Sequence, residues 1–129
     1  MSRLIESIKI HEGFSGEVYQ DTLGFDTIGY GTKLPLSKSE AEAILEMRLR
    51  AKITELKMRK PIVKELSEER RQILAEMSYQ LGVNGVVRFK KMWIAIEEGN
   101  YETARKEMLD SRWFNQTPSR ARELADRMA

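Results

Sequence analysis

Glycine is concentrated in one short stretch, and this constrains the fold more than any other feature of the chain. Five of the eight glycines, at positions 13, 16, 24, 29 and 31, fall within residues 13–36. The same stretch is rich in β-branched and aromatic residues and lacks helical periodicity, which predicts one or two short hairpins. Gly24 suits a turn, and glycine inside a strand often marks close approach of backbone or ligand.

The rest of the chain has helical patterning. Leu4, Ile5 and Ile8 predict a short first helix with Ser2 as its N-cap, ending after Glu12 where Gly13 follows. Ser37 and Glu40 form a capping box. The apolar spacing that follows predicts a helix over 38–59, which Pro61 ends.

Four further helices are expected in the second half. Ser67 should cap the first of them and Gly82 should end it. Thr117-Pro118 is an N-cap followed by proline at the first helical position. We interpret the methionines of these helices as core residues; they are Met77, Met92, Met108 and Met128.

Length and composition exclude several classes of protein. The chain has 129 residues, 41% of them hydrophobic and 33% charged, which fits one globular domain. It has no cysteine, and its single histidine, His11, rules out a multi-histidine metal site. Residues 1–40 hold four basic and six acidic side chains, whereas residues 41–129 hold eighteen and fourteen. This asymmetry can steer an anionic ligand, but on charge alone an ordinary solvated surface is the favoured explanation.

One spacing of polar residues suggests chemistry. A carboxyl group ends the first helix, and a second carboxyl and a hydroxyl follow in the hairpin; they are Glu12, Asp21 and Thr27. Glycosidic hydrolysis needs two carboxyl groups across the bond, one as acid and one acting with water. The same spacing occurs again five positions later, at Glu17, Asp26 and Thr32. The spacing alone leaves both sets open and favours the first modestly, because Glu12 closes a helix.

The stretch HEGFSGEVYQDTLGFDTIGYGTKL resembles the N-terminal signature of the phage-type lysozymes, the endolysins of glycoside hydrolase family 24. A second block, SRWFNQTPSRA, is similar to the family's C-terminal signature. The likeness covers nearly the whole chain, which closely resembles the lysozymes of T-even coliphages in a shortened form. It selects Glu12, Asp21 and Thr27 as the catalytic set.

The resemblance also implies an architecture. We expect a mostly α, α+β lysozyme-like fold in a single domain over 1–129. Residues 13–36 would form a β-hairpin lobe, 38–59 a bridging helix and 61–129 a helical lobe. The glycan would bind in a cleft between the lobes.

Further site residues follow from the resemblance alone. The expected substrate-binding residues are Gly31, Tyr79, Gln80, Phe89 and Arg112. Arg120 would support the site by pairing with Glu12. For Arg112 and Trp113, a purely structural helix corner is an equal alternative.

The sequence departs from the longer family members. The loop and helix that they insert after the hairpin are missing, and so is their last C-terminal segment. Lys33 stands where an apolar residue of the cleft is common.

The expected function is a muramidase, a bacteriolytic hydrolase that cleaves the β-1,4 bond between N-acetylmuramic acid and N-acetylglucosamine in peptidoglycan. No cofactor or metal is expected, and neither is a nucleic-acid partner, stable membrane association or oligomer. The N-terminus shows no signal peptide, so we expect synthesis in the host bacterial cytoplasm and action on the cell wall after release. The alternatives are a non-catalytic peptidoglycan-binding module of the same fold and a helical nucleic-acid binder, for which no basic stripe interleaved with aromatics is seen.

Overall fold

The computed structural model describes all residues 1–129, and their contacts divide the chain into two compact units. Unit 1 spans Met1–Ile44 and unit 2 spans Leu45–Ala129. The boundary falls inside one continuous helix, α2 (Lys38–Arg59). No helix combines the length and the apolar composition that crossing a membrane requires.

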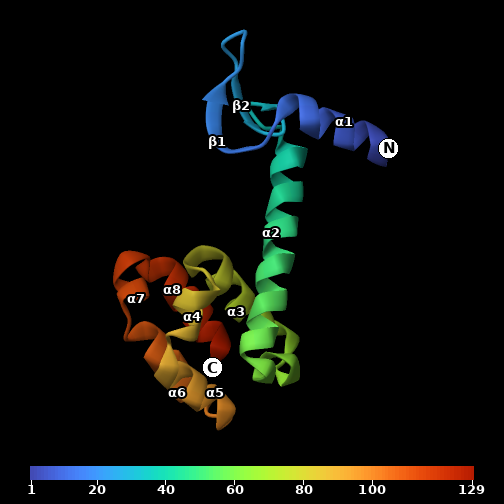
Figure 1. The fold of residues 1–129 in the computed structure, drawn as a ribbon. Coiled ribbons are helices and arrows are strands. Elements are labelled where there is room, and N and C mark those ends of the chain that lie inside the picture. Colours follow the sequence, from blue (N-terminus) through green and yellow to red (C-terminus); the bar gives the residue numbers. More distant parts are fainter. The chain divides into compact units, whose positions relative to one another are not determined.

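Unit 1 consists of helix α1, a small sheet and the start of α2 (Figure 1). Helix α1 (Ser2–Glu12) ends where Gly13 takes a φ of +70°. The strands β1 (Ser15–Gln20), β2 (Asp26–Gly29) and β3 (Thr32–Lys33) form an antiparallel sheet in the order β1-β2-β3. The expectation of short hairpins in this stretch is therefore confirmed.

The register of the sheet sets the neighbours of Thr27. It lies in the central strand β2, opposite Tyr19 of β1 and Lys33 of β3. The pairing of β1 with β2 is irregular between Ser15 and Tyr19. Thr27 is the one buried residue of unit 1, and every residue of α1 keeps at least part of its surface exposed.

The long helix α2 has the bounds predicted from its flanking residues. Its capping box is formed, because the Glu40 amide donates to Ser37 Oγ at 3.1 Å and the Ser37 amide donates to Glu40 Oε1 at 2.9 Å. The helix ends at Arg59, and Pro61 begins a short 3₁₀ helix, η1 (Pro61–Glu65). By contrast, the expected N-cap Ser2 is the first residue inside α1 and forms no capping bond.

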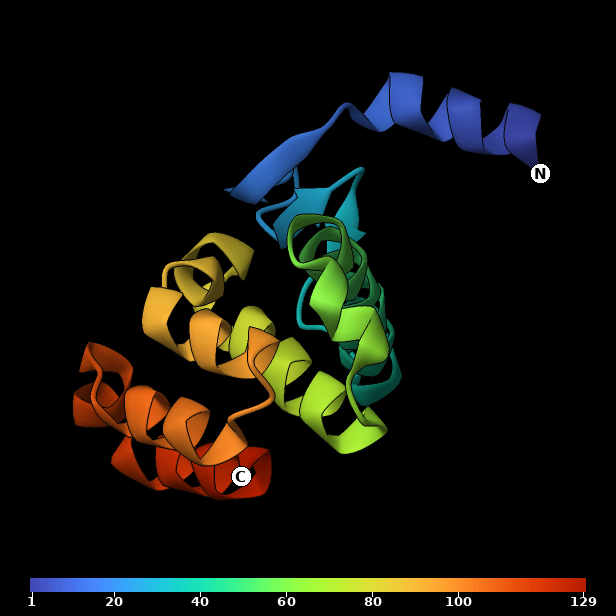
Figure 2. The same cartoon turned by 90° about the horizontal axis from the view of Figure 1, so that it is seen from below.

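Unit 2 is helical, and its helices gather around one core (Figure 2). After α2 and η1 it contains α3 (Glu68–Leu81), α4 (Val83–Val87), α5 (Lys90–Glu97), α6 (Tyr101–Leu109), α7 (Arg112–Gln116) and α8 (Pro118–Met128). Ser67 caps α3 by accepting from the Arg70 amide at 3.2 Å, and Gly82 ends that helix with a φ of +79°. Both helix signals read from the sequence are confirmed.

The core of unit 2 contains all four methionines that the sequence assigned to it. Each has no exposed surface; they are Met77, Met92, Met108 and Met128. Trp93 is also buried, and its indole N–H donates to the Val86 carbonyl at 2.9 Å. The contacts of α6 with α5 and α8 bring the second half of the chain together around these side chains.

Candidate active site

Asp21 lies at the first corner of the turn between β1 and β2. The Gly24 amide donates to the Asp21 carbonyl at 3.0 Å, and Gly24 has a φ of +84° that suits glycine. The side-chain oxygen Oδ1 of Asp21 accepts from the amides of Leu23 and Phe25, both at 2.9 Å. This turn holds one oxygen of the carboxylate in place and leaves Oδ2 for other partners.

Lys33 donates a hydrogen bond to the other carboxylate oxygen of Asp21. Its Nζ lies 2.5 Å from Asp21 Oδ2, across the sheet from β3. The hydrogen bond from Lys33, followed by the one from the Phe25 amide, lowers the pKa of Asp21 below its usual value. In turn the hydrogen bond to Asp21 raises the pKa of Lys33, and the charge of Glu12 adds to that rise. Asp21 is therefore held as a carboxylate.

Phe25 connects Asp21 to Thr27 through its backbone. The Thr27 hydroxyl donates to the Phe25 carbonyl at 2.8 Å, and the Asp21 amide donates to the same carbonyl at 2.9 Å. Thr27 is only 1% exposed, so its side chain is fixed by packing as well as by this bond. The turn thus brings together the second carboxyl and the hydroxyl that the sequence singled out.

Glu12 is placed against the turn between β2 and β3. Gly31, in that turn, has a φ of +76°, and a Cβ built on it would lie 2.6 Å from both Cδ and Oε2 of Glu12. The absence of a side chain at Gly31 therefore makes room for the Glu12 carboxyl. Phe14 packs on Tyr30 with ring centroids 5.4 Å apart, and Lys9 Nζ lies 5.5 Å from the Tyr30 centroid. These contacts hold the end of α1 on the turn.

The side chains of the alternative set of polar residues have no bonding partners that would hold them in place. The side chains of Glu17, Asp26 and Thr32 are exposed, and none of them forms a hydrogen bond or ion pair in the structure. Glu17 uses its backbone alone, with Ser15 Oγ donating to the Glu17 carbonyl at 2.7 Å. The geometry of unit 1 supports the set with Glu12, Asp21 and Thr27.

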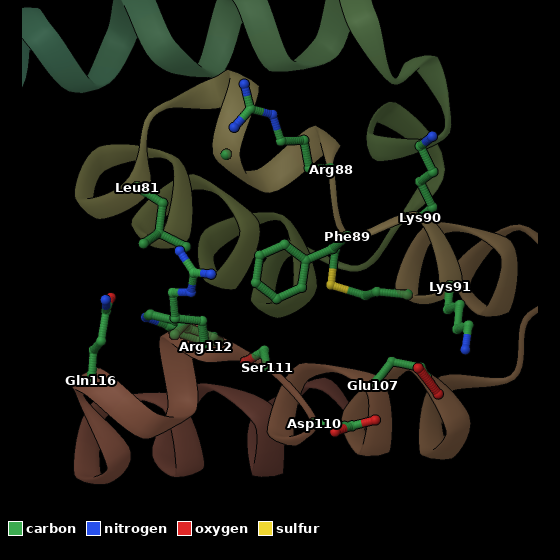
Figure 3. A pocket seen from close by; sticks show the side chains of 13 residues that line it. Leu81, Arg88, Phe89, Lys90, Lys91, Glu107, Asp110, Ser111, Arg112 and Gln116 are labelled. Atoms are coloured by element: carbon green, nitrogen blue, oxygen red, sulfur yellow. The ribbon is translucent and has the colours of Figure 1, made fainter.

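Two of the expected substrate-binding residues line a pocket of unit 2 (Figure 3). Phe89 and Arg112 approach it from different segments, Phe89 from just before α5 and Arg112 from the start of α7. The pocket has a volume of about 570 Å³. Its rim carries both charges, with Lys90 and Lys91 on one side and acidic residues of and just after α6 on the other, Glu107 and Asp110.

Gln80 is held rigidly beside this pocket. Its Oε1 accepts from the Trp113 indole at 3.0 Å, and its Nε2 donates to Thr117 Oγ1 at 3.3 Å. Trp113 is buried and meets the Phe89 ring edge-on, with centroids 6.1 Å apart. The Thr117 hydroxyl is thereby used for Gln80 and the Trp113 carbonyl, so it does not cap α8 as its sequence position suggests.

Tyr79 and Arg120 line a second pocket of unit 2, formed by α2, α3 and α8. Tyr79 is 39% exposed. Arg120 Nε donates to Glu76 Oε2 at 2.9 Å, which gives this arginine a partner within its own unit. The pairing of Arg120 with Glu12 joins residues of the two different units and stays a prediction.

Two residues of the hairpin contribute to the candidate site although the spacing of polar residues gives them no role. By the family resemblance Lys33 is only a departure from an apolar position, yet it forms the ion pair with Asp21. Phe25 acts through its backbone amide and carbonyl, which leave no signal in a pattern of side-chain types. The position of Lys33, six residues after Thr27 in a glycine-rich hairpin, is the one sequence sign that could have pointed to this pair.

The family of this chain follows from its match to a known protein family. Residues 9–129 match the family described as Phage lysozyme, which covers most of the chain. The chain belongs to the phage lysozyme family. Membership supports a lysozyme-like function on peptidoglycan, of the glycoside hydrolase class.

Individual relatives agree with membership in the phage lysozyme family. The chain is 29% identical to the "Probable T4-type lysozyme 1" of Dictyostelium discoideum, over 96% of this chain and 92% of that protein. It is 30% identical to the "Pre-baseplate central spike protein Gp5" of Enterobacteria phage T4, over 92% of this chain but 26% of that protein. The family resemblance read from the sequence is therefore confirmed.

Proposed function

We propose that this chain is a muramidase that hydrolyses the β-1,4 bond between N-acetylmuramic acid and N-acetylglucosamine in peptidoglycan and so lyses bacterial cells. Glu12 is the general acid in this proposal. Asp21 and Thr27 act with a water on the opposite face of the sugar, and the product has the inverted configuration. Neither step calls for a metal or a cofactor.

Glu12 is suited to the acid role by its position and its surroundings. Its carboxyl lies against the backbone of Gly31, in the space that a Cβ at that position would fill. A glycan strand that reaches Gly31 would meet this carboxyl and displace water from it. Loss of water favours the neutral, proton-carrying form of a carboxyl group, which is the form that protonates the leaving oxygen.

The free acceptor positions of Asp21 and Thr27 carry the proposal. A carboxylate has about four acceptor positions, and three on Asp21 are filled, by Leu23, Phe25 and Lys33. The open position is on Oδ2. The Thr27 hydroxyl gives its proton to the Phe25 carbonyl, so its oxygen remains an acceptor.

These two acceptors suit an attacking water. A water that donates one hydrogen to Asp21 Oδ2 and the other to Thr27 Oγ1 keeps a lone pair for the sugar carbon. The ionised Asp21 also stabilises the positive charge that develops on the sugar ring. Asp21 then accepts the proton of the water as the bond forms.

Substrate contacts extend beyond the reacting groups. Five residues are proposed to hold the glycan: Gly31, Tyr79, Gln80, Phe89 and Arg112. In support, the indole and hydroxyl partners of Gln80 fix its amide, and Phe89 and Arg112 line one pocket. Arg120 is proposed as a support rather than a reacting group.

Analysis of the products tests this function most completely. Purified peptidoglycan is incubated with the protein, and the released fragments are identified by mass and by the sugar at the reducing end. The muramidase proposal expects N-acetylmuramic acid there, and proton NMR of a soluble chitin-like or muramyl oligomer should show the α anomer first. Fragments ending in N-acetylglucosamine, or the β anomer first, would contradict it.

The same experiment separates the enzyme from a binding module. A non-catalytic module would co-sediment with peptidoglycan and release no new reducing ends over hours. Asp21→Asn serves as the matched variant, since it removes the charge but keeps the shape of the side chain. Equal co-sedimentation with loss of product in this variant supports catalysis.

A further inference from the structure

Lys33 is the one cation in direct contact with the carboxylate of Asp21. Three elements bring titratable groups to this place: β3 contributes Lys33, β1 contributes Tyr19 and the end of α1 contributes Glu12. The lysine ammonium lies 2.5 Å from Asp21 Oδ2 and 5.8 Å from the centroid of the Phe25 ring. Lys33 thus contacts the side chain of Asp21 and the ring of the residue that joins Asp21 to Thr27.

We propose that Lys33 is a positioning residue that holds the Asp21 carboxylate by a charge-assisted bond and fixes its plane, so that the last free acceptor position of Oδ2 is turned to the attacking water. This inference rests on the proposed muramidase function and assigns a role to a residue that the catalytic pattern does not contain.

Geometry supports the role before electrostatics is considered. The two amides of the turn anchor Oδ1, but bonds to one oxygen leave the carboxylate free to rock about it. A charge-assisted bond from Lys33 to Oδ2 fixes the second oxygen and hence the plane. Precise placement of a catalytic group contributes to rate because a small displacement of the reacting atoms is costly.

Charge acts in the same direction. An adjacent ammonium stabilises the ionised form of a carboxyl, which agrees with the lowered pKa of Asp21. The side chain of Lys33 is 59% exposed and that of Asp21 is 17% exposed. Because the lysine is largely in solvent, its replacement should leave the fold intact, and salt should weaken the pair.

Three variants separate positioning from other effects of a lysine. Lys33→Met keeps most of the side-chain length without the charge, and Lys33→Arg keeps the charge. Lys38→Met removes the same charge from an exposed site at the start of α2, so it controls for a change in net charge. Circular dichroism and thermal unfolding of each variant establish that it is folded.

The readouts are the pH dependence of kcat/KM on a soluble muramyl oligomer and the ¹³C titration of the Asp21 carboxyl. Removing the cation should raise the pKa of Asp21, so Lys33→Met should move the acid-side limb of the rate profile to higher pH. The NMR titration midpoint of Asp21 should move in the same direction. Lys33→Arg should restore both, and Lys38→Met should match the wild type.

The outcomes distinguish this inference from the function on which it rests. If the wild type is active and the Lys33→Met profile superimposes on it, or the variant is faster near neutral pH, Lys33 does not position Asp21 and the inference is overturned. The same holds if Lys38→Met moves the limb equally. A folded wild type that releases no reducing ends at any pH contradicts the proposed function itself, and the role of Lys33 falls with it.

Discussion

Phe25 contributes to the candidate site with its backbone. Its amide donates to Asp21, and its carbonyl accepts from both Asp21 and Thr27. Since the two polar side chains bond to backbone groups of the same residue, a shift of this turn would displace both together. The chemistry proposed here thus depends on the turn as much as on the residue types.

Thr27 allows the role of a hydroxyl to be isolated. Thr27→Val has nearly the same shape in this buried position, and the Phe25 carbonyl keeps its bond from the Asp21 amide. We expect kcat to fall by roughly 10- to 100-fold, the equivalent of one hydrogen bond of about 1–3 kcal/mol. KM should change little, because orientation of water matters mainly in the transition state.

Steady-state kinetics on a soluble oligomer measures this split, and Thr27→Ser is the matched variant that retains the hydroxyl. Its kcat should stay closer to the wild type than that of Thr27→Val. A rise in KM alone for the valine variant would refute the orienting role of Thr27.

A substitution at Gly31 tests whether activity requires the Glu12 carboxyl in its position beside this turn. Gly31→Ala places a Cβ where the Glu12 carboxyl lies and also strains a backbone with a φ of +76°. We expect a loss of activity of at least tenfold with the rest of the hairpin preserved, as measured by lysis rate and by NMR of the β1–β2 pair.

Gly99→Ala provides the comparison for Gly31→Ala. Gly99 lies in unit 2, outside the turn that holds Asp21, and has a φ of +72°, but a Cβ there meets nothing within 4 Å. The two variants thus share the backbone strain and differ in the clash with Glu12. Equal losses for both would mean that strain, and not the position of Glu12, explains the effect.

At the scale of elements, the sequence predicts a helix well where a capping or breaking residue marks each of its ends. Helix α2 has a capping box at its start and Pro61 after its end, and its bounds agree with the prediction. The sequence does not predict the short helices η1, α4 and α7, because five residues are too few to show a helical period. Thr117 shows the other limit, since a partner far along the chain, Gln80, uses the hydroxyl that would otherwise cap α8.

The cap of α3 leads to a stability prediction. Ser67 Oγ accepts from the Arg70 amide, a bond that alanine cannot replace. Ser67→Ala should lower the free energy of unfolding of unit 2 by about 1 kcal/mol, measured by urea denaturation of the full chain followed by tryptophan fluorescence. Both tryptophans lie in unit 2.

Ser119→Ala is the matched control for the cap. Ser119 lies exposed in the first turn of α8 and forms no side-chain hydrogen bond in the structure. Its replacement should leave the free energy of unfolding within a few tenths of a kcal/mol. A loss as large as that of Ser67→Ala would show that the cap is not the cause.

At the scale of the whole molecule, the buried core and the candidate catalytic residues lie in different units. The buried apolar side chains belong to unit 2, and unit 1 has Thr27 as its buried residue. The candidate catalytic residues lie in unit 1, whereas four of the five expected substrate-binding residues lie in unit 2. Periodicity predicted the core because apolar spacing is directly visible in a sequence.

The site was predictable only in part. Residue types and spacing favour Glu12, Asp21 and Thr27 as the candidate set only modestly over a second set, and the family resemblance selects between the two. The Lys33–Asp21 pair and the bonds through Phe25 depend on strand register and turn conformation, which side-chain patterns do not encode. The catalytic roles, the substrate contacts and the pairing of Arg120 with Glu12 all remain predictions.

The central claim is that Glu12, and not Glu17, donates the proton that breaks the glycosidic bond. The direct measurement is the rate of release of reducing ends from purified peptidoglycan by Glu12→Gln and Glu17→Gln, two isosteric changes five positions apart. We expect Glu12→Gln to lose about 10²- to 10⁴-fold while staying folded and bound to peptidoglycan, and Glu17→Gln to keep most of the wild-type rate. An active Glu12→Gln beside an inactive Glu17→Gln would contradict the account.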